Sequence, residues 1–533
     1  MTTFVHELIS HSAQHSPNAV ALQSKDSQLS YAQLNQTVKQ VAQSYLSLAI
    51  TPGDRIGIYL AKNQENITSI FACSQIGAVF VPINPVLKAG QVQYIANDCQ
   101  LKVLITNKAR FKALATILST LTALETVIIL DADEQELSEL SKANSPALLA
   151  WSNFTRAGEQ STDISNPVLN SSLQANDLAA ILYTSGSTGQ PKGIMLSHQN
   201  IVLGAKSVSE YLHLSANDNI LAVLPLSFDY GLNQLTSSFL VGAKCVLLDY
   251  LLANDVIKTI AKYKITGLAA VPPLWMQLAK APWPDNIASS IRYFTNSGGV
   301  LTPATLLTLR QKMPQAKPYL MYGLTEAFRS SYLEPSLVDK KPNSIGKAIP
   351  NVELIVLRED GNECQPEEVG ELVHVGPLVT LGYWQNAVAT RERYKKVPKQ
   401  AKNPHHSPLA VFSGDYVKKD EQGYLYFVSR KDAMIKTSGY RVSPSELESE
   451  LLTLAEVDEV CVIARPSETL GQEIVALIVT SIADQECVSK IINKHCQMNL
   501  PNYMIPRQLI FLTALARNAN GKIDTTLLTK KYS

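Results

Sequence analysis

The segment from Tyr183 to Gly193, YTSGSTGQPKG, has residue types that are suited to holding phosphate. Its glycines let backbone N–H groups turn toward an anion, and its hydroxyl side chains and Lys192 add hydrogen-bond donors. The P-loop pattern G-x-x-x-x-G-K-[ST] is absent, because Gln-Pro separates Gly189 from Lys192 and a glycine follows the lysine. A flexible surface linker would have a similar composition, but a linker seldom lies between two well-formed apolar segments. We therefore expect a phosphate-binding loop that differs from the loop of P-loop kinases and ATPases.

The elements that must position this loop alternate between strands and helices. RIGIYLA (55–61) and AVFVPI (78–83) have the apolar runs of buried strands, and NITSIFACSQIG (66–77) between them has a helical pattern. Similar short apolar runs follow at KVLIT, TVIILD, AAILYT, ILAVLPL and KCVLLD. The alternation predicts an α/β fold with layered subdomains and largely parallel sheets over the first 400 residues.

The pattern changes after Gly370. GELVHVGPLVTLGYW (370–384) and YLYFVSRKDAMIKTSGYRV (424–442) are rich in short strands, glycines and aromatic residues, which predicts a β-rich layer at the end of the large domain. The last hundred residues contain an amphipathic helix (443–454), two strands (459–465 and 473–480) and a second helix near 484–498. We expect a large domain over 1–430 and a small α+β domain over 431–533.

Composition limits the classes of partner. The 533 residues carry 47 basic and 46 acidic side chains, and this balance does not suggest nucleic acid or an anionic membrane as a partner. The seven cysteines are scattered and never spaced as CxxC, which disfavours a disulfide framework or a zinc site and favours a reducing cytosol. The first residues, MTTFVHELISHSAQ, lack the basic start and the long apolar run of a signal peptide. The apolar window 70–83 is too short to span a bilayer. We expect a cytoplasmic protein with no membrane span, in which the basic segment 395–408 is a solvated loop.

The sequence resembles the AMP-forming adenylating enzymes, a family that includes acyl-CoA synthetases, aryl ligases, luciferases and amino-acid adenylation proteins. Besides the glycine-rich loop, an ordered set of motifs carries this resemblance along nearly the whole chain. The motifs are LSYAQLN (29–35), GDRIGIYLAKN (53–63), LPLSFDYGLNQL (224–235), NSGGVL (296–301), MYGLTEA (321–327), SIGKAIPN (344–351), GELVHVGPLVTLGYW (370–384), SGDYV (413–417), SRKDAMIKTSGYRVSPSELE (429–448) and NGKID (520–524).

The resemblance implies a ligase that works in two steps. A carboxylate attacks the α-phosphorus of ATP, while Mg²⁺ and positive charge stabilise the pentavalent phosphorus and the leaving pyrophosphate. The acyl-adenylate then reacts with a thiol. The implied cofactors are ATP and Mg²⁺, and the implied acceptor is the phosphopantetheine thiol of CoA or of a carrier protein.

The resemblance also implies which residues hold the nucleotide. Contacts to the β- and γ-phosphates are expected from Thr184, Ser185, Ser187, Thr188 and Gly189, with help from Lys192. Glu326 is the expected Mg²⁺ ligand with Thr184 nearby, although a glutamate there could instead cap a helix. Gly298 and Gly299 are expected beside adenine, Tyr322 as its stacking partner and Thr325 at the α-phosphate. Asp415 and Arg430 are expected at the ribose, although Tyr322 could be a core aromatic and Asp415 a turn residue.

Two further roles belong to the small domain. Lys522 in NANGKID is the expected catalytic cation, whose charge offsets the negative charge that builds between the carboxylate and the α-phosphate. Ala516 stands where most relatives have a proline, which bears on the rigidity of the Lys522 loop. In the family the small domain rotates about the residue that matches Asp432, and Gly439 then lines a tunnel for the thiol.

The acid is expected to bind at LPLSFDYGLNQ, where Phe228, Asp229 and Tyr230 lie, and near Gly323. Amino-acid adenylation proteins use such a Phe-Asp pair to bind the α-ammonium of the substrate, which makes an amino acid the first hypothesis and proline its first specific candidate. Prolyl carrier-protein ligases and bacterial acyl-CoA ligases of exosortase-type gene clusters share similar sequences here. The alternative is therefore an acyl-CoA ligase for a fatty or other small acid.

Several broader alternatives stay open. The chain ends soon after Lys522, so we expect a stand-alone protein that acts on free CoA or on a separate carrier protein. A luciferase-like oxidase or a non-catalytic relative is disfavoured, because nothing identifies an oxygen-handling pocket and because Lys522, Glu326 and Asp415 are all present.

Overall fold

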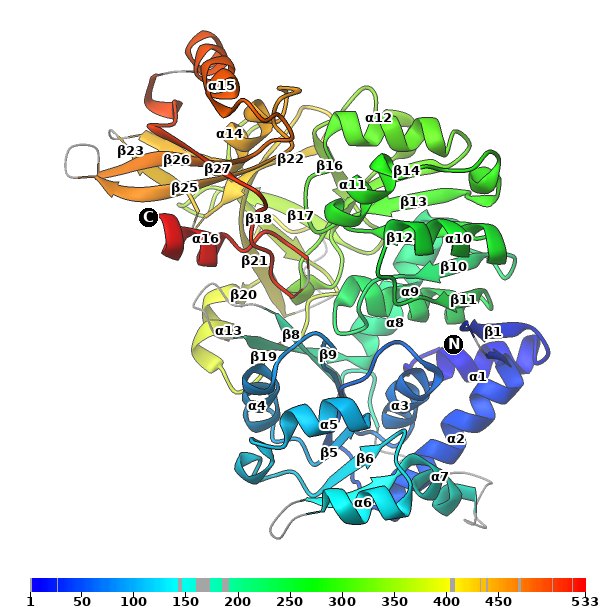
Figure 1. Cartoon of the computed structure of the whole chain (residues 1–533). Helices are drawn as coiled ribbons and strands as arrows, with labels where there is room; N and C mark the ends of the chain where they lie inside the picture. Colours follow the sequence, from blue (N-terminus) through cyan, green and yellow to red (C-terminus); the bar gives the residue numbers. More distant parts are fainter. Residues whose placement is uncertain are drawn as a thin grey trace.

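The computed structural model describes residues 2–25, 27–141, 146–159, 173–184, 191–402, 408–431, 433–437, 440–467, 471–500, 502–519 and 521–533. Within these ranges the strands form three sheets, and helices cover the sheets (Figure 1). No helix among the described residues is long and apolar enough to cross a membrane. All seven cysteines are described, and none of them forms a disulfide.

The first sheet belongs to the N-terminal half of the chain and has the order β19-β9-β8-β4-β3-β5-β6-β7. Its strands are β3 (Arg55–Ile58), β4 (Val79–Pro82), β5 (Val103–Thr106), β6 (Thr126–Ile129), β7 (Ala147–Ala150), β8 (Leu178–Thr184), β9 (Lys192–Ser197) and β19 (Gly382–Tyr383). The strands from β3 to β8 pair in parallel, whereas β9 pairs antiparallel with both β8 and β19. The helices that connect them are α3 (Gln64–Gln75), α4 (Ala89–Asp98), α5 (Lys108–Leu114), α6 (Glu134–Leu140) and α7 (Trp151–Glu159).

The second and largest sheet combines a parallel and an antiparallel part. The parallel part contains β1 (Val20–Gln23), β10 (Asn219–Ala222), β11 (Lys244–Leu247), β12 (Gly267–Ala270), β13 (Tyr293–Asn296) and β14 (Lys317–Tyr322), with β2 (Gln28–Ser30) antiparallel at its edge. The antiparallel part contains β15 (Ser331–Leu333), β16 (Ser344–Ala348), β17 (Glu353–Leu357), β18 (Gly370–Val375), β20 (Tyr394–Lys396), β21 (Leu409–Lys419) and β22 (Leu425–Arg430). The associated helices are α1 (Glu7–His15), α2 (Tyr31–Ser47), α8 (His198–Tyr211), α9 (Asp229–Leu240), α10 (Ala253–Tyr263), α11 (Pro272–Lys280), α12 (Pro303–Lys312) and α13 (Ala387–Arg393).

The third sheet forms the small C-terminal domain, which is orange to red in Figure 1. Its strands are β23 (Ile435–Thr437), β24 (Tyr440–Val442), β25 (Glu459–Ser467), β26 (Gly471–Val479) and β27 (Gln508–Leu512), and its helices are α14 (Pro444–Leu451), α15 (Gln485–Asn499) and α16 (Thr525–Tyr532). Its core is separate and includes Leu447, Val462, Ile474 and Ile492. The domain boundary expected after Arg430 falls between β22, in the second sheet, and β23, in the third.

Local sequence signals explain where these elements begin. In α2 the side chain of Ser30 accepts a hydrogen bond from the Gln33 N–H, and the Gln33 side chain accepts one from the Ser30 N–H, so the helix begins with a capping box. Residues Leu34, Val38, Val41 and Tyr45 then recur at helical spacing and are buried. The motif LSYAQLN is thus the start of a core helix.

The predicted α/β class, with a large N-terminal and a small C-terminal domain, is confirmed. The expected strands and helices at 55–61, 66–83, 370–375, 443–454 and 459–480 are present, with ends shifted by a few residues. Two details differ from the expectation. The strand expected over ILAVLPL ends at Ala222, and the PKG end of the glycine-rich segment is not loop but the start of β9, where Lys192 lies opposite Thr184. Backbone pairing with β8 draws these residues into the sheet, an effect that local composition does not reveal.

Candidate active site

A cavity of about 1530 Å³ lies where the large domain meets the small one. The parallel strands β10, β12, β13 and β14 point their carboxyl ends toward it, which is the usual place for a ligand in an open α/β sheet. The cavity is lined by most of the residues that the sequence predicted for the site. They are Thr184, Lys192, Phe228, Asp229, Gly298, Gly299, Tyr322, Gly323, Thr325, Glu326, Asp415, Arg430 and Lys522.

Among the described residues, Tyr230 is the one predicted site residue that does not line this cavity. Tyr230 is buried beside Phe228 and Asp229, and its hydroxyl makes a hydrogen bond with the Thr295 hydroxyl. Ser185, Ser187, Thr188, Gly189, Asp432 and Gly439 lie outside the described residues, so their expected roles stay predictions.

The described ends of the glycine-rich loop are fixed by the β8–β9 ladder. Thr184, the last residue of β8, is paired with Lys192, the first residue of β9, so both lie at the mouth of the loop. The Lys192 ammonium nitrogen lies 5.4 Å from the centre of the Tyr383 ring, which is a cation–π contact. Both side chains therefore line the cavity from a rigid strand pair.

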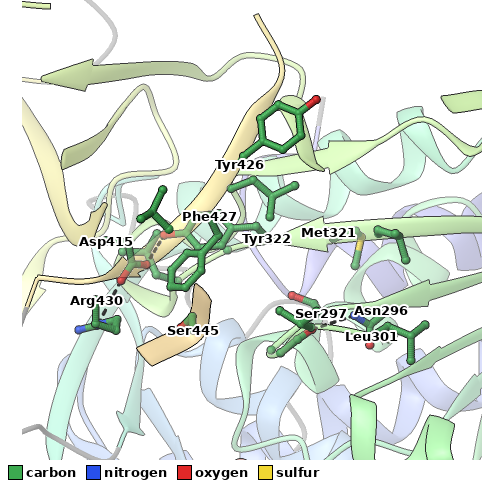
Figure 2. Close-up of a pocket in the computed structure, with 18 of the residues that line it drawn as sticks. Asn296, Ser297, Leu301, Met321, Tyr322, Asp415, Tyr426, Phe427, Arg430 and Ser445 are labelled. Carbon is green, nitrogen blue, oxygen red and sulfur yellow. Dashed lines mark hydrogen bonds and ion pairs between the residues drawn. The ribbon is translucent and has the colours of Figure 1, made fainter. Parts of the chain in front are cut away.

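The nucleoside end expected from the sequence is built around Asp415 (Figure 2). The Tyr322 hydroxyl donates to Oδ2 of Asp415, and the Arg430 Nε lies 3.1 Å from Oδ1. β21 and β22 place Asp415 and Arg430 directly opposite each other. Burial raises the pKa of Asp415, and the charge of Arg430 and the hydrogen bond from Tyr322 act against this shift. The structure thus places Tyr322, expected at the adenine, beside Asp415 and Arg430, which were expected together at the ribose, and the carboxylate is contacted from two sides.

Glu326 lies in a short 3-10 turn directly after β14. Its Oε1 accepts a hydrogen bond of 2.6 Å from the Tyr383 hydroxyl, and the Arg393 Nε is 4.0 Å from the same oxygen. No cluster of three or more Asp, Glu, His or Cys side chains that could hold a metal occurs in the described part of the chain. Mg²⁺ that arrives with a nucleotide needs only one or two protein oxygens, because phosphates and water supply the others. Glu326 and Thr184, which line one cavity, fit this requirement.

The small domain brings Lys522 into the cavity. The N–H of Gly521 donates to the Asn518 carbonyl at 2.9 Å and closes the turn before the lysine. The Asn84 side chain of the large domain donates to the Ala519 carbonyl at 3.0 Å and holds this turn against the cavity. Gly298 has φ +81°, and a Cβ there would lie 3.3 Å from Cε of Lys522. The glycine therefore leaves room for the lysine stem.

Lys522 is electrostatically coupled to the residues around it. Burial lowers its pKa, and the charges of Asp229 and Asp415 oppose that shift. Its ammonium nitrogen lies 5.7 Å from the centre of the Phe228 ring. The lysine thus lies between the expected acid pocket and the expected nucleoside site, where a cation would stabilise negative charge that develops during reaction.

The expected acid pocket contains a buried ion pair that the sequence did not predict. Asp229 is the first residue of α9, and its Oδ1 accepts a hydrogen bond of 3.2 Å from the Thr325 hydroxyl. Its Oδ2 lies 2.8 Å from Nη1 of Arg329, and both side chains are only 4% exposed. The role of Asp229 as an ammonium acceptor stays a prediction, and the carboxylate already has a cation beside it.

Sequence reasoning missed Arg329, Tyr383 and Arg393. Each lies within or close to a quoted motif. Each is far in sequence from the residue that it contacts: Arg329 pairs with Asp229, and Tyr383 and Arg393 approach Glu326. The available signal for Arg329 was its place between Phe328 and two serines, in a segment that continues as strand β15. Arginine is rarely fully buried unless it is paired, so its position suggested a functional or ion-pair role.

Comparison with known proteins gives the same assignment over nearly the whole chain. Residues 9–384 match the model of the AMP-binding enzyme family, and residues 446–522 match the AMP-binding enzyme C-terminal domain. The chain is 28% identical over 512 residues to the indoleacetate–CoA ligase of Aromatoleum aromaticum, covering 95% of this chain and 94% of that protein. It is 27% identical over 535 residues to the L-proline–[L-prolyl-carrier protein] ligase of Pseudomonas fluorescens, covering 99% of both.

Other relatives are much longer. Gramicidin S synthase 2 of Brevibacillus brevis is 28% identical over 545 residues, which cover 99% of this chain and only 11% of that protein. This chain therefore corresponds to one segment of such a protein.

Among solved structures, the anthranilate CoA ligase AuaEII in complex with anthranoyl-AMP aligns with a TM-score of 0.84 and 25% identity over 100% of this chain and 99% of that one. The cavity geometry and these matches lead to one conclusion: the chain belongs to the AMP-binding enzyme family and has the two-domain fold of its AMP-forming ligases.

Proposed function

We propose that this protein is an AMP-forming ligase that activates a small carboxylic acid with ATP and transfers the acyl group to a phosphopantetheine thiol. The observation that carries the proposal is that Lys522 of the small domain lines the same cavity as Asp415, Glu326 and Asp229 of the large domain. One cavity therefore offers groups for ribose, for a metal-bound phosphate and for the acid. The acceptor thiol belongs to CoA or to a separate carrier protein.

In the first step, the residues of this chain position ATP and the acid. Asp415, oriented by Tyr322 and Arg430, accepts hydrogen bonds from the ribose hydroxyls. Thr184, Lys192 and the loop that joins them bind the β- and γ-phosphates. Mg²⁺, when bound by Glu326 with Thr184 nearby, supplies positive charge to the phosphates.

At the reacting atoms, the acid carboxylate attacks the α-phosphorus, and pyrophosphate leaves. Lys522 offsets the charge that develops between the carboxylate and the α-phosphate. The Thr325 hydroxyl, which donates to Asp229 in the structure, turns its proton to an α-phosphate oxygen when ATP is bound. Gly298 and Gly299 allow the adenine to approach the backbone. The product is an acyl-adenylate.

For the second step, we propose that the small domain, taken as residues 431–533, turns relative to residues 1–430. Asp432 would serve as the hinge and Gly439 would line the path of the thiol. This turn would have to break contacts between the two domains. They include the hydrogen bond from Asn84 to Ala519 and an ion pair of 3.6 Å between Lys280 and Asp458.

Two classes of acid fit the family. An amino acid, with proline as the first candidate, is supported by the full-length similarity to a prolyl-carrier-protein ligase and by Asp229 in the acid pocket. A small acyl or aryl acid, loaded on CoA, is supported by the similarity to the indoleacetate–CoA and anthranilate CoA ligases. In both cases the unpaired cysteines are compatible with a reducing cytosol.

The test is acid-dependent exchange of labelled pyrophosphate into ATP. The purified protein is screened with amino acids, fatty acids and aryl acids in the presence of Mg²⁺, with a reaction lacking acid as the control. We expect exchange with a restricted set of acids and none in the control. Absence of exchange with every acid, by a protein shown to be folded, would contradict the proposed function.

A further inference from the structure

Arg329 has hydrogen-bonding capacity that the protein does not use. Its Nη1 donates to Oδ2 of Asp229 at 2.8 Å and to the carbonyl of Phe328 at 3.1 Å. Its Nε and Nη2 are buried and have no hydrogen-bond partner among the residues that the structure describes. The side chain is 4% exposed and lines the cavity. Buried charged donors without partners are costly, so they suggest a ligand.

The open edge of the guanidinium has a defined shape. Nε and Nη2 form the edge that presents two parallel N–H bonds, which matches the two oxygens of a carboxylate. The guanidinium carbon lies 4.8 Å from the centre of the Tyr230 ring and 5.7 Å from that of Phe328. These aromatic contacts and the ion pair with Asp229 hold the guanidinium in place, so the open edge is pre-organised.

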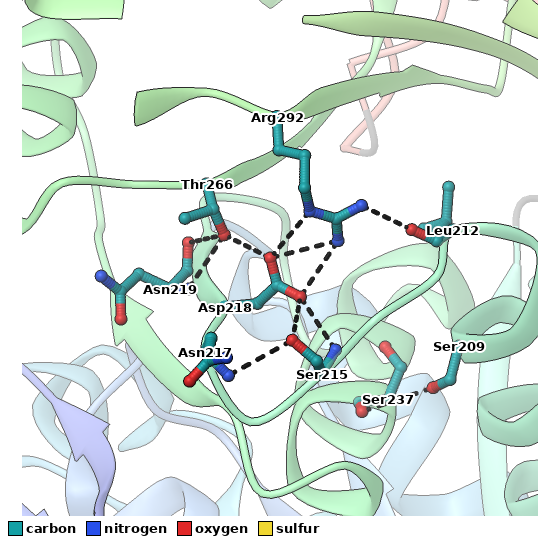
Figure 3. Close-up of polar contacts among 9 residues, drawn as sticks. All are labelled: Ser209, Leu212, Ser215, Asn217, Asp218, Asn219, Ser237, Thr266 and Arg292. Carbon is teal, nitrogen blue, oxygen red and sulfur yellow. Dashed lines mark hydrogen bonds and ion pairs between the residues drawn. The ribbon is translucent and has the colours of Figure 1, made fainter. Parts of the chain in front are cut away.

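A second arginine–aspartate pair in the same domain has no open edge. Arg292 donates through Nε and Nη2 to the Asp218 carboxylate at 3.0–3.2 Å, and through Nη1 to the Leu212 carbonyl at 2.9 Å (Figure 3). All three of its guanidinium nitrogens have partners, and it does not line the cavity. An arginine that serves only the fold can therefore be fully satisfied here, which makes the open edge of Arg329 informative.

We propose that the acid activated by this protein carries a second carboxylate, which binds the Nε–Nη2 edge of Arg329. The inference rests on the proposed function and narrows it to acids with two carboxyl groups, with or without an α-ammonium. Asp229 is the only carboxylate that the structure pairs with Arg329 among the described residues, and Lys522 adds a second cation to this end of the cavity. The reacting carboxylate is then matched by Lys522 and the distal carboxylate by Arg329. Proline lacks the second carboxylate and is expected to be a poor substrate.

The experiment measures separately how a second carboxylate and an α-ammonium of the acid affect its activation. Pyrophosphate exchange is measured with four acids of equal chain length, namely pentanoate, 2-aminopentanoate, glutarate and glutamate. The same design is repeated with four- and six-carbon chains and with benzoate against benzenedicarboxylates, and proline is included. We expect kcat/KM for the best dicarboxylate to exceed that for its monocarboxylate partner by about 100-fold, because a buried arginine edge is left unpaired by the partner.

The variants test whether Arg329 is the cause. In Arg329→Met the preference for the dicarboxylate should fall to about unity, while Arg292→Met should keep the native preference. Because Arg329→Met leaves Asp229 buried without its cation, the uncharged pair Asp229→Asn with Arg329→Gln is the second variant, and it should also lose the preference.

The outcomes are distinguishable. Native protein that prefers pentanoate, 2-aminopentanoate or proline would overturn the inference and leave the proposed function intact. An unchanged preference in a folded Arg329 variant would also overturn it. Absence of exchange with every acid would count against the proposed function itself.

Discussion

The two arginine–aspartate pairs lie at opposite ends of the same parallel sheet. Asp218 directly precedes β10 and Arg292 directly precedes β13, at the amino ends of these strands. Asp229 follows β10 and Arg329 follows β14, at the carboxyl ends, where the cavity lies. One strand, β10, thus connects the two regions.

The pairs differ in how completely they are satisfied. The Asp218 carboxylate accepts hydrogen bonds from the Thr266 hydroxyl at 2.7 Å and from the Ser215 N–H at 2.9 Å, in addition to those from Arg292. Arg329 keeps two nitrogens without a partner among the described residues. A network in which every donor is paired, like that of Arg292 and Asp218, stabilises the ends of the strands that it joins. A network with unpaired donors, like that of Arg329 and Asp229, can still bind a ligand but is less stable without one. The pairs also differ in burial, because the Arg292 side chain is 37% exposed and the Arg329 side chain only 4%. The comparison teaches that an ion pair does not by itself reveal its role, and that unused buried donors are the better indicator.

The largest expected effect is on stability at the closed pair. In Arg292→Met the Asp218 side chain, 4% exposed, is left without its cation. Because Arg292 itself is 37% exposed, we expect the free energy of unfolding to fall by about 3 kcal/mol, the lower end of the range for a broken buried pair. Urea denaturation measures this loss. Arg310→Met is the control, because it removes an exposed ion pair with Asp339 and should cost less than about 1 kcal/mol. Equal losses in the two variants would contradict the structural role of the Asp218–Arg292 pair.

A smaller effect on stability is expected at Glu448, whose carboxylate lines the cavity. This carboxylate accepts a hydrogen bond from the Val462 N–H and has no ion pair within the described ranges. Burial raises its pKa from 4.5 to about 7. The unfolded chain loses this proton near pH 4.5 and the folded protein near pH 7, so stability falls as pH rises through this window and levels off above it.

Glu448→Gln should remove this dependence, which amounts to about 3 kcal/mol at most. The denaturation midpoint of the native protein and of the variant is compared between pH 4.5 and pH 7. If the midpoints of the native protein and the variant change with pH in parallel, Glu448 ionises normally in the folded protein. A buried carboxylate at this position would then be stable in its charged form without an arginine beside it.

The smallest effect is expected on ATP binding, when the hydrogen bond between Tyr322 and Asp415 is removed and the ion pair between Arg430 and Asp415 is kept. Tyr322→Phe removes one hydrogen bond to Asp415 and leaves Arg430 in place. We expect a loss of about 1 kcal/mol in ATP binding, seen as a roughly fivefold higher KM for ATP in the exchange assay. Tyr332→Phe, whose ring stacks on Tyr211 away from the cavity, should leave KM unchanged. A similar rise in both variants would argue against a specific role for the Tyr322 hydroxyl.

Local patterns in the sequence predicted much of the fold. The alternation of apolar strands and amphipathic helices is a property of neighbouring residues, so β3, α3 and β4 could be placed before the structure was known. The capping box at Ser30, which the structure shows and which was not predicted from the sequence, also depends on only four adjacent residues. The antiparallel pairing of β8 with β9 depends on a partner strand and could not be predicted in this way.

The same distinction between local patterns and contacts with distant residues applies to the site. Most residues expected to bind ATP lie in motifs, and the structure gathers Tyr322, Asp415 and Arg430 into one contact network. The partners of Asp229 and Glu326 were not predictable, because Arg329 lies 100 positions from Asp229 and Tyr383 lies 57 positions from Glu326. Which donors remain open is a property of the packed structure alone.

The most direct test of the central claim, that this cavity is an adenylation site completed by the small domain, is pyrophosphate exchange by Lys522→Ala. With an acid that supports exchange in the native protein, we expect the rate to fall by about 10²–10³-fold while ATP binding changes little, because the lysine acts on charge that develops during the reaction. Lys494→Ala, an exposed lysine of the same domain, is the matched control and should exchange at the native rate. Exchange near the native rate in Lys522→Ala would contradict the account.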